Sequence, residues 1–184
     1  DGKGKEALFN TILSIAVDLD GNILACDIAN NRIRKITTDG LVTTIAGTGA
    51  WGYKDGKASE AEFLMPMDLC VDKKGNIYIA DIGNHCIRKI DSNNVVTTIA
   101  GKAGIVGYVD GEGKNALFYQ PHGIAVNEKG EIFVADLLNH AIRKITPEGF
   151  VTTLAGTREI GFKDGGGKDA RFNRPGGVMV YTDG

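Results

Sequence analysis

A ten-residue phrase occurs three times in this chain and constrains its fold more than any other feature. It reads DIANNRIRKI from Asp27, DIGNHCIRKI from Asp81 and DLLNHAIRKI from Asp136, at intervals of 54 and 55 residues. Each copy follows two apolar runs separated by a turn with glycine, and each precedes V-T-T-[IL]-A-G. Repeats of this length are typical of chains in which one supersecondary unit packs against copies of itself. We therefore expect an array of three like units.

Each unit contains four short segments with strand character. In the second unit these are 68–71, 76–80, 86–90 and 95–100, and the links between them are four or five residues long. Links this short join antiparallel neighbours. The second segment of each unit is apolar at consecutive positions, which indicates a sheet covered on both faces. Sheets stacked face to face describe the blades of a β-propeller, and the missing 3.6-residue period excludes a helical solenoid.

Three phrases carry a resemblance to a known family. PHGIAV from Pro121, GNIYIADIGNH from Gly75 and the recurring IRKI resemble the NHL repeat, which is named for an Asn-His-Leu signature. The Asn-His pair is present at Asn84-His85 and Asn139-His140, whereas the first unit has Asn30-Asn31 and the third position holds Cys or Ala in the other two units. The resemblance covers essentially the whole chain. It implies a propeller, commonly six-bladed, that mostly serves as a binding platform.

The expected fold is therefore all-β, an NHL-type propeller segment over 1–184. It would contain three complete four-stranded blades, at about 12–47, 66–101 and 121–156, and the first strand of a fourth at 176–180. Three blades do not close a ring. The chain is then either a partial ring from a six-bladed propeller, which we favour because of the surplus strand and the start in mid-phrase, or a half-ring that pairs with a second copy. Open blade faces would promote self-association in either case.

Composition limits the kinds of partner and the cellular setting that we expect for this chain. The net charge of −2 argues against a nucleic-acid surface, and no apolar run is long enough to span a membrane. Three cysteines stand where other units have alanine, so we expect small buried fillers. Unpaired cysteines and the lack of an N-x-[ST] acceptor favour an intracellular setting. There is no G-x-S-x-G elbow, phosphate loop or pair of catalytic carboxylates, so we expect no catalytic residue and no cofactor.

The links between units are the longest in the chain, at about twenty residues, and such loops are often functional. They emerge on the same side as the links between the second and third segments, and we call this side the long-loop face. Each loop contains G-[YF]-x-D-G and then A-x-F, and we expect these aromatic side chains to fill gaps between blades. The runs D-G-E-G at 110 and D-G-G-G at 164 resemble a calcium loop but lack its alternating ligands, so each Asp is expected to bond to N–H groups of its own turn. Trp51 differs from its counterparts Val106 and Ile160, which suggests a partner contact.

The repeated Asp and Arg of the phrase predict a structural ion pair. Asp ends the second segment of each unit and Arg lies inside the third, so an antiparallel pair brings them together. This interpretation is preferred to catalytic carboxylates or an anion site. The residues concerned are Asp27, Asp81, Asp136, Arg34, Arg88 and Arg143.

The function expected is a non-catalytic binding or scaffold module that recognises a protein or another ligand with its long-loop face. The candidate binding residues are Trp51, Tyr53, Lys54, His85 and His140, although a turn-stabilising imidazole is the simpler interpretation of the two histidines. The alternative is a metal-dependent hydrolase or lyase with His122, at the start of an axial strand, as a metal ligand in the central channel. The primary interpretation contains no metal.

Overall fold

The computed structural model describes residues 1–181 and consists of three antiparallel sheets with short 3-10 turns. The first sheet contains β1 (Gly2–Lys3), β2 (Ile12–Val17), β3 (Ile23–Asp27), β4 (Arg32–Ile36) and β5 (Leu41–Ala46). The second contains β6 (Gly56–Lys57), β7 (Pro66–Val71), β8 (Ile77–Asp81), β9 (Cys86–Ile90) and β10 (Val95–Gly101). The third contains β11 (Gly111–Glu112), β12 (Pro121–Val126), β13 (Ile132–Asp136), β14 (Ala141–Ile145) and β15 (Phe150–Gly156).

Single 3-10 turns accompany these strands. Three of them, η2 (Ile28–Asn30), η4 (Ile82–Asn84) and η5 (Leu137–Asn139), follow the second long strand of each sheet. The others, η1 (Gly4–Glu6), η3 (Ala58–Glu60) and η6 (Gly167–Asp169), lie in the long loops or their N-terminal counterpart. No helix in residues 1–181 is long and apolar enough to cross a membrane.

Each sheet has four long strands in chain order, as the repeat predicts, and a fifth that the sequence did not reveal. The order in the second sheet is β6-β10-β9-β8-β7, so β6 pairs with the outermost long strand. This two-residue strand comes from the D-G of the long loop. The loop from one sheet therefore crosses to the outer edge of the next sheet before it enters the inner strand, and this path accounts for much of its length.

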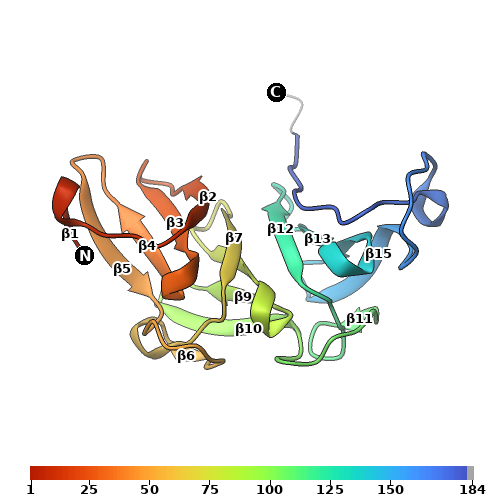
Figure 1. The fold of residues 1–184 in the computed structure, drawn as a ribbon, viewed down its shortest axis with the longest axis horizontal. Coiled ribbons are helices and arrows are strands. Elements are labelled where there is room, and N and C mark those ends of the chain that lie inside the picture. The colour runs from red at the N-terminus through yellow and green to blue at the C-terminus, as the bar shows by residue number, and fades with distance from the viewer. Residues whose placement is uncertain (182–184) are drawn as a thin grey trace.

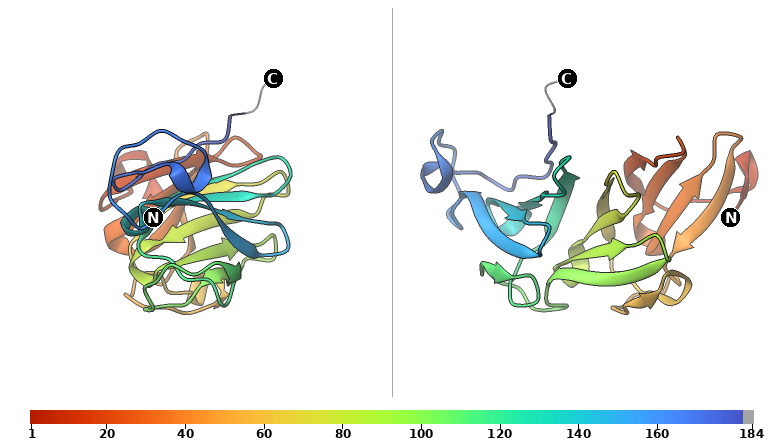
Figure 2. Two further views of the ribbon diagram at one scale, coloured as in Figure 1. Left: turned by 90° about the vertical axis from the view of Figure 1, so that its right-hand side faces the viewer. Right: turned by 180° about the vertical axis from the view of Figure 1, so that it is seen from behind.

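The three sheets lie along an arc, with β2, β7 and β12 on its concave side (Figure 1). Seen along the row, they overlie one another (Figure 2). Side chains of β8 alternate between two cores, with Ile79 facing the first sheet and Tyr78 and Ala80 facing the third. This double burial explains why the strand is apolar at consecutive positions. The arrangement is that of propeller blades.

Backbone geometry fixes the turn that follows each second long strand. Asn31, His85 and His140 adopt left-handed φ values of 51°, 58° and 53°. Gly101 also has a positive φ, of 91°, and a Cβ there would lie 2.6 Å from the carbonyl oxygen of His85. The glycine of V-T-T-[IL]-A-G is therefore needed for close approach of the outer strand to this turn.

The cysteines lie inside the stack. Cys26 and Cys86 are buried, Cys70 is half-buried, and all three are free thiols. Burial raises the pKa of each thiol, so they remain protonated near neutral pH. Their surroundings fit the expected role of small apolar fillers.

Residues 176–180, expected to begin a fourth blade, are not a strand in the structure. A strand needs a hydrogen-bonded neighbour, and no second strand of that blade is present in residues 1–181. The segment runs on the concave side toward β12 (Figure 1), where the Nδ1 of His122 lies 2.6 Å from the carbonyl oxygen of Gly176.

Candidate functional site

The three arginines of the repeated phrase are buried beside the aspartates of the same phrase. The Nη1 atoms of Arg34, Arg88 and Arg143 lie 2.6, 2.9 and 2.8 Å from the carboxylate oxygens of Asp27, Asp81 and Asp136. The pairing follows from register, because β8 and β9 are antiparallel and joined by a single 3-10 turn. In each sheet the two charged groups face one another and are shielded from solvent.

A second carboxylate reaches each arginine from the D-G motif. Asp55 accepts hydrogen bonds from Nε and Nη2 of Arg88 at 3.1 and 2.7 Å, and from the backbone N–H of Thr98 at 2.9 Å. Asp110 accepts a hydrogen bond from Nη2 of Arg143 at 2.6 Å and one from the backbone N–H of Thr153 at 3.0 Å. The expectation that Asp110 bonds within its own turn was wrong, because β11 carries it to the outer edge of the third sheet, where it meets Arg143 and Thr153.

Aromatic rings complete the surroundings. The guanidinium carbon of Arg88 lies 4.9 Å from the ring centre of Tyr53 and 5.0 Å from that of Phe63. Arg143 lies in the same way between Tyr108 and Phe118. We call the two rings and two carboxylates around Arg88, and likewise those around Arg143, the arginine cage. Cation–π contacts of this kind stabilise a charge that has lost its water.

Electrostatics favour charged pairs at neutral pH. Burial raises the pKa of Asp81 to about 6, against the lowering effect of Asn84, Arg88 and the N–H of Leu64. Burial also raises the pKa of Asp136. Although burial alone would lower it, the carboxylates of Asp81 and Asp55 hold the pKa of Arg88 above its ordinary value. Each caged arginine is thus charged, and it binds backbone carbonyl groups of the adjacent long loop.

On that face, Trp51 borders an apolar hollow between the first two sheets. The hollow has a volume of about 290 Å³, and the Trp51 side chain is 80% exposed. Its walls come from the turn after β3, from the residue before β2 and from the start and end of the long loop: Thr11, Ile28, Ala29, Asn31, Trp51, Leu64 and Met65. Sequence reasoning identified Trp51 but missed Ile28, Leu64 and Met65, because residues distant in sequence meet here only through stacking of the blades.

Tyr53 and Lys54 lie further along the same loop and are partly used by the fold. The hydroxyl of Tyr53 lies 2.9 Å from the Oγ1 of Thr98, and its ring is over Arg88. The Lys54 carbonyl accepts from Nη2 of Arg88, while its ammonium group is exposed and 3.7 Å from Glu60. The Tyr53 side chain is therefore partly exposed, and the ammonium group of Lys54 is accessible to solvent.

His85 and His140 connect neighbouring units. The Nδ1 of His85 accepts from the backbone N–H of Gln120 at 3.2 Å, and that of His140 accepts from Arg174 at 3.0 Å. Asn31, their counterpart in the first unit, accepts from Met65 at 2.9 Å through its side-chain oxygen. The side-chain amide of Asn31 and the imidazoles of His85 and His140 therefore accept equivalent hydrogen bonds in the three units.

His122 is the second residue of the inner strand β12, directly after the long loop. Nearby on the inner strands, Asp68 accepts from Ser14 and from the N–H of Ile124, so its carboxylate links all three sheets. In residues 1–181 there is no group of three or more His, Cys, Asp or Glu side chains placed to hold a metal ion.

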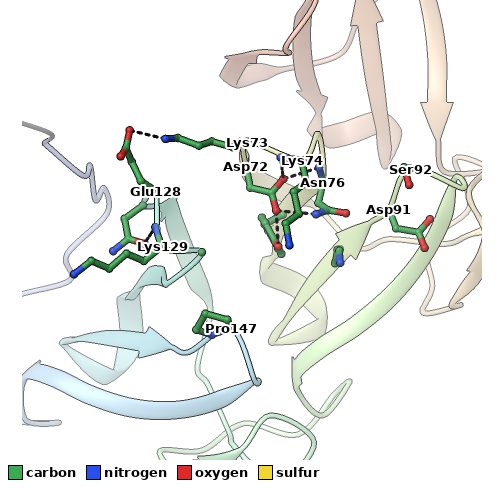
Figure 3. Close-up of a pocket in the computed structure, with 13 residues that line it drawn as sticks. Asp72, Lys73, Lys74, Asn76, Asp91, Ser92, Glu128, Lys129 and Pro147 are labelled. Atoms are coloured by element: carbon green, nitrogen blue, oxygen red, sulfur yellow. Dashed lines mark hydrogen bonds and ion pairs between the residues drawn. The ribbon is translucent and has the colours of Figure 1, made fainter. Parts of the chain in front are cut away.

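Another hollow, of about 500 Å³, lies on the opposite face between turns of the second and third sheets (Figure 3). Charges of both signs line it. Asp72 is occupied by Asn76 and by N–H groups of its own turn. Lys73 pairs with Glu128 across the opening at 2.9 Å. Mutual pairing makes this a weaker candidate for ligand binding than the Trp51 hollow.

Comparison with known families identifies the repeats. The family model described as "Teneurin NHL domain" matches residues 48–109, and the "NHL repeat" model matches residues 118–145. The chain is 38% identical over 94 residues to Protein SUPPRESSOR OF QUENCHING 1, chloroplastic, of Arabidopsis thaliana, covering 50% of this chain and 9% of that protein. It is 41% identical over 101 residues to NHL repeat-containing protein 2 of Gallus gallus, covering 54% and 14%.

A further relative has the name of an enzyme. The chain is 36% identical over 90 residues to Probable peptidyl-alpha-hydroxyglycine alpha-amidating lyase pgal-1 of Caenorhabditis elegans, covering 47% of this chain and 24% of that protein. In all three cases the matched stretch spans less than a quarter of the relative.

Solved structures share the fold at low identity. A Bacteroides thetaiotaomicron protein of unknown function has a TM-score of 0.77 at 24% identity, covering 93% of this chain and 42% of that one. An auxiliary nutrient binding protein from the same organism has a TM-score of 0.72 at 22% identity, and the match covers 92% of this chain and 42% of that one. Streptogramin B lyase gives 0.65 at 15%, covering 96% and 47%.

Proposed function

The chain belongs to the NHL-repeat β-propeller family, and from this premise we propose that it is a binding module that recognises a protein segment on its long-loop face. The observation that carries the proposal is the hollow beside Trp51. It is apolar, it opens to solvent, and Trp51, which is 80% exposed, belongs to a residue type enriched at binding hot spots.

The position of the hollow supports this choice. At the next junction the counterpart of Trp51 is Val106, and Tyr119 takes the place of Leu64 and lies edge-on against His85 with ring centres 5.8 Å apart. Packing repeats from blade to blade, whereas a recognition site is made by the residues that depart from the repeat. Trp51, Leu64 and Met65 in the hollow are such residues, because the corresponding positions before the third sheet hold Val106, Tyr119 and Gln120.

The chemistry of the ligand follows from the walls. Ile28, Leu64 and Met65 provide apolar contact, and Trp51 provides a large flat surface. A volume of about 290 Å³ suits one or two apolar side chains rather than a large cofactor. Lys54, on the same loop, adds a positive charge at the surface. We therefore expect the bound segment to present an apolar side chain next to an acidic residue.

A peptide library tests the proposal. Linear peptides are selected on the wild-type chain, with counter-selection on Trp51→Val, which installs the residue found at the next junction. Selected peptides are then titrated into the chain while fluorescence is recorded, and Trp51 is the sole tryptophan. We expect a Trp51-dependent class with an apolar–acidic pattern, and at least tenfold weaker binding to Trp51→Val by calorimetry.

A matched control separates the hollow from the face as a whole. Val106→Ser alters the corresponding position of the second loop, and we expect it to bind the selected peptides with unchanged affinity. Selection that yields no Trp51-dependent peptide would refute the proposed site.

A second candidate is a lyase or hydrolase with a site on the axis, and it rests on the lyase relatives and on His122. If Nδ1 of His122 donates to the Gly176 carbonyl, the free lone pair is on Nε2, which is the form that binds metals. Elemental analysis after incubation with Zn²⁺ tests it. Stoichiometric metal that disappears in His122→Gln would favour this candidate over the binding module.

A further inference from the structure

The lysine of the recurring IRKI is paired in the first and third units but not in the second. Nζ of Lys35 lies 2.8 Å from the carboxylate of Asp18, and Nζ of Lys144 lies 3.0 Å from that of Glu131. Lys89 holds the same position in the second unit, is half-buried, and forms no ion pair within residues 1–181. An ammonium group that has lost part of its water is stabilised by an anion beside it.

A tyrosine takes the carboxylate that Lys89 would otherwise use. The hydroxyl of Tyr78 donates to Oδ2 of Asp72 at 3.0 Å, whereas Oδ2 of Asp18, the counterpart of Asp72, lies beside Lys35. Tyr78 and Lys89 are direct partners across β8 and β9, so both side chains lie on one face of the sheet. The counterparts of this tyrosine in the other two units have no hydroxyl: Leu24 and Phe133. The second unit therefore differs from the others by one hydroxyl group, which leaves its lysine without a partner.

Lys89 lies where two hollows adjoin. One is the hollow of about 500 Å³ between the second and third sheets, in which Pro147 lies across from the turn that carries Lys74 and Asn76 (Figure 3). The other measures about 280 Å³, and its apolar walls are Ile99, Ile132 and Ile145. The residues that line both hollows are Tyr78, Lys89, Gly130 and Pro147. We call the two hollows together the Lys89 groove, and its size suits a small organic ligand.

The carboxylates that line the Lys89 groove are bound to other groups. Glu128 pairs with Lys73, and Asp72 is occupied as described above. Hydrogen bonds from the N–H groups of Val95 and Asn93, together with the charge of Lys89 at longer range, lower the pKa of Asp91, which thus binds its own turn.

The last carboxylate of the groove, that of Glu148, is bound as well, because the hydroxyl of Thr146 hydrogen-bonds to it and lowers its pKa. Lys74 and Lys129, which also line the larger hollow, form no ion pair within residues 1–181. The pairing of charges at the rim therefore leaves the positive charge of Lys89 available to a ligand.

We propose that the Lys89 groove binds a small organic anion, with a carboxylate or phosphate group on the ammonium of Lys89 and an apolar body against the isoleucine walls. Lysine is a compact point charge with three donors, so it accepts either headgroup. This ligand is separate from the protein segment proposed for the Trp51 hollow, which lies on the opposite face. The corresponding hollow between the first and second sheets, of about 310 Å³, is lined by Asp18, Asp20 and the paired Lys35 and should not bind the anion.

Titration of the ¹⁵N-labelled chain with four probes tests the proposal, with amide shifts near Lys89 as the signal. Phenylacetate and phenyl phosphate carry both a ring and a charge, benzyl alcohol has only the ring, and inorganic phosphate has only the charge. We expect the better of the two charged-ring probes to bind with a dissociation constant of about 1 mM, as suits a ligand of this size. The other two probes should bind about tenfold more weakly, because each lacks one of the two contacts. The tighter of phenylacetate and phenyl phosphate identifies the headgroup.

Variants connect the binding to the lysine. Lys89→Met should weaken binding of the charged-ring probes about tenfold, because the charge-assisted hydrogen bond is lost. Tyr78→Phe installs the residue of the third unit and releases Asp72 to pair with Lys89, so we expect about threefold weaker binding although the ring is kept. Lys35→Met is the matched control in the first unit, and Trp51→Val is the control for the opposite face. Both should bind the probes like the wild type.

Circular dichroism confirms the fold of each variant before titration, and Lys89→Gln serves as a second substitution of the lysine. Three results overturn the proposal. The first is that neither charged-ring probe gives saturable shifts up to about 20 mM, well above the expected dissociation constant. The second is unchanged affinity in the lysine variants. The third is equal binding of benzyl alcohol, which would show that the apolar walls act without the charge. Failure of the Trp51 hollow to select peptides has no bearing on these results.

Discussion

Arg88 and Arg34 hold the same position in neighbouring sheets, yet their surroundings differ. All the N–H groups of Arg88 face acceptors, namely Asp81, Asp55 and two backbone carbonyls, and two rings lie within about 5 Å of the guanidinium carbon. Nε of Arg34 is buried without a hydrogen-bond partner among the described residues, and the single ring near its guanidinium, that of Phe9 at 4.9 Å, is 41% exposed. Arg143 shares the unpaired Nε, so the second ring distinguishes the interior cages from the end.

The difference between Arg34 and Arg88 shows which contacts of a blade arise within its own repeat and which come from the preceding one. The Asp–Arg pair arises within one repeat, so Asp27 and Arg34 meet as closely as Asp81 and Arg88. The second ring comes from the loop of the preceding unit, which crosses to the next sheet. A blade in this chain is therefore completed by its neighbour, which is why stability in such arrays depends on contacts between units.

The largest expected effect comes from removing the arginine itself. Arg88→Ala leaves Asp81 buried without its partner and empties the space between two rings, and we expect a loss of about 3–5 kcal/mol in the free energy of unfolding. Arg34→Ala should cost about 1 kcal/mol less, because one ring is missing. Urea unfolding measures both losses in the free energy of unfolding, with the dependence on urea concentration compared between the variants. Equal losses would show that the second ring contributes nothing.

The rings give the next comparison. Phe118 is fully buried, and Phe118→Ala should cost about 3–4 kcal/mol through loss of apolar burial and the cavity left behind. Phe9 is the equivalent residue at the open end, and Phe9→Ala should cost about 1–2 kcal/mol because its ring is already partly in water. Thermal unfolding checks the order of the two variants, and a reversed order would contradict the assignment of the first sheet as an open end.

A smaller effect is expected at the second carboxylate. Asp110 is half-exposed and binds Arg143 together with the N–H and Oγ1 of Thr153, so Asp110→Ala should cost about 2 kcal/mol. Asp164 holds the same repeat position but is exposed, with no arginine beside it in residues 1–181. Asp164→Ala should change stability by less than about 0.5 kcal/mol in the single chain. A large loss in both variants would mean that this Asp stabilises its own loop.

Much of the blade could be read from the repeat because its signals are local. The apolar runs, the short polar links and the Asp–Arg spacing within ten residues fix four strands and bring Asp81 to Arg88. The contact of Asp55 with Arg88 spans 33 residues and depends on the path of the long loop, which no periodicity encodes. The sequence did contain one signal for this contact, namely an Asp at the same position in all three long loops. A turn by itself does not require a carboxylate at a fixed position, so the repetition indicates a contact outside the turn.

The site on the long-loop face shows the same limit. Trp51 was identified because it departs from the repeat, but the hollow beside it is made by Ile28, Leu64 and Met65 from segments that meet only after two sheets stack. The aromatic loop residues were expected between blades, and Phe63 and Phe118 are indeed buried there. Tyr53 and Phe162 are substantially exposed instead, because the first covers an arginine and the second lies at an end of the array.

The smallest expected effect concerns the hydrogen bond from each unit to the next, which Asn31 makes with an amide and His85 with an imidazole. Nδ1 of His85 can accept this bond only when it carries no proton. Burial lowers the pKa of His85 from its ordinary 6.5, and burial also lowers that of His140. The unfolded chain therefore takes up protons first as pH falls. The stability contributed by these histidines is present above pH 6.5 and is lost as pH falls below it.

His85→Asn places the amide of the first unit at the second junction and removes one titrating group. We expect the variant to match the wild type within about 0.5 kcal/mol at pH 7.5 and to exceed it by up to about 1 kcal/mol near pH 5, because the amide keeps the hydrogen bond to Gln120 at both values. Urea unfolding at the two pH values measures the difference, from which the raised pKa values of Asp81 and Asp136 cancel because both proteins contain them. Parallel pH profiles would mean that the imidazole of His85 is not the acceptor at this junction, and the equivalence of the three units at this position would not hold.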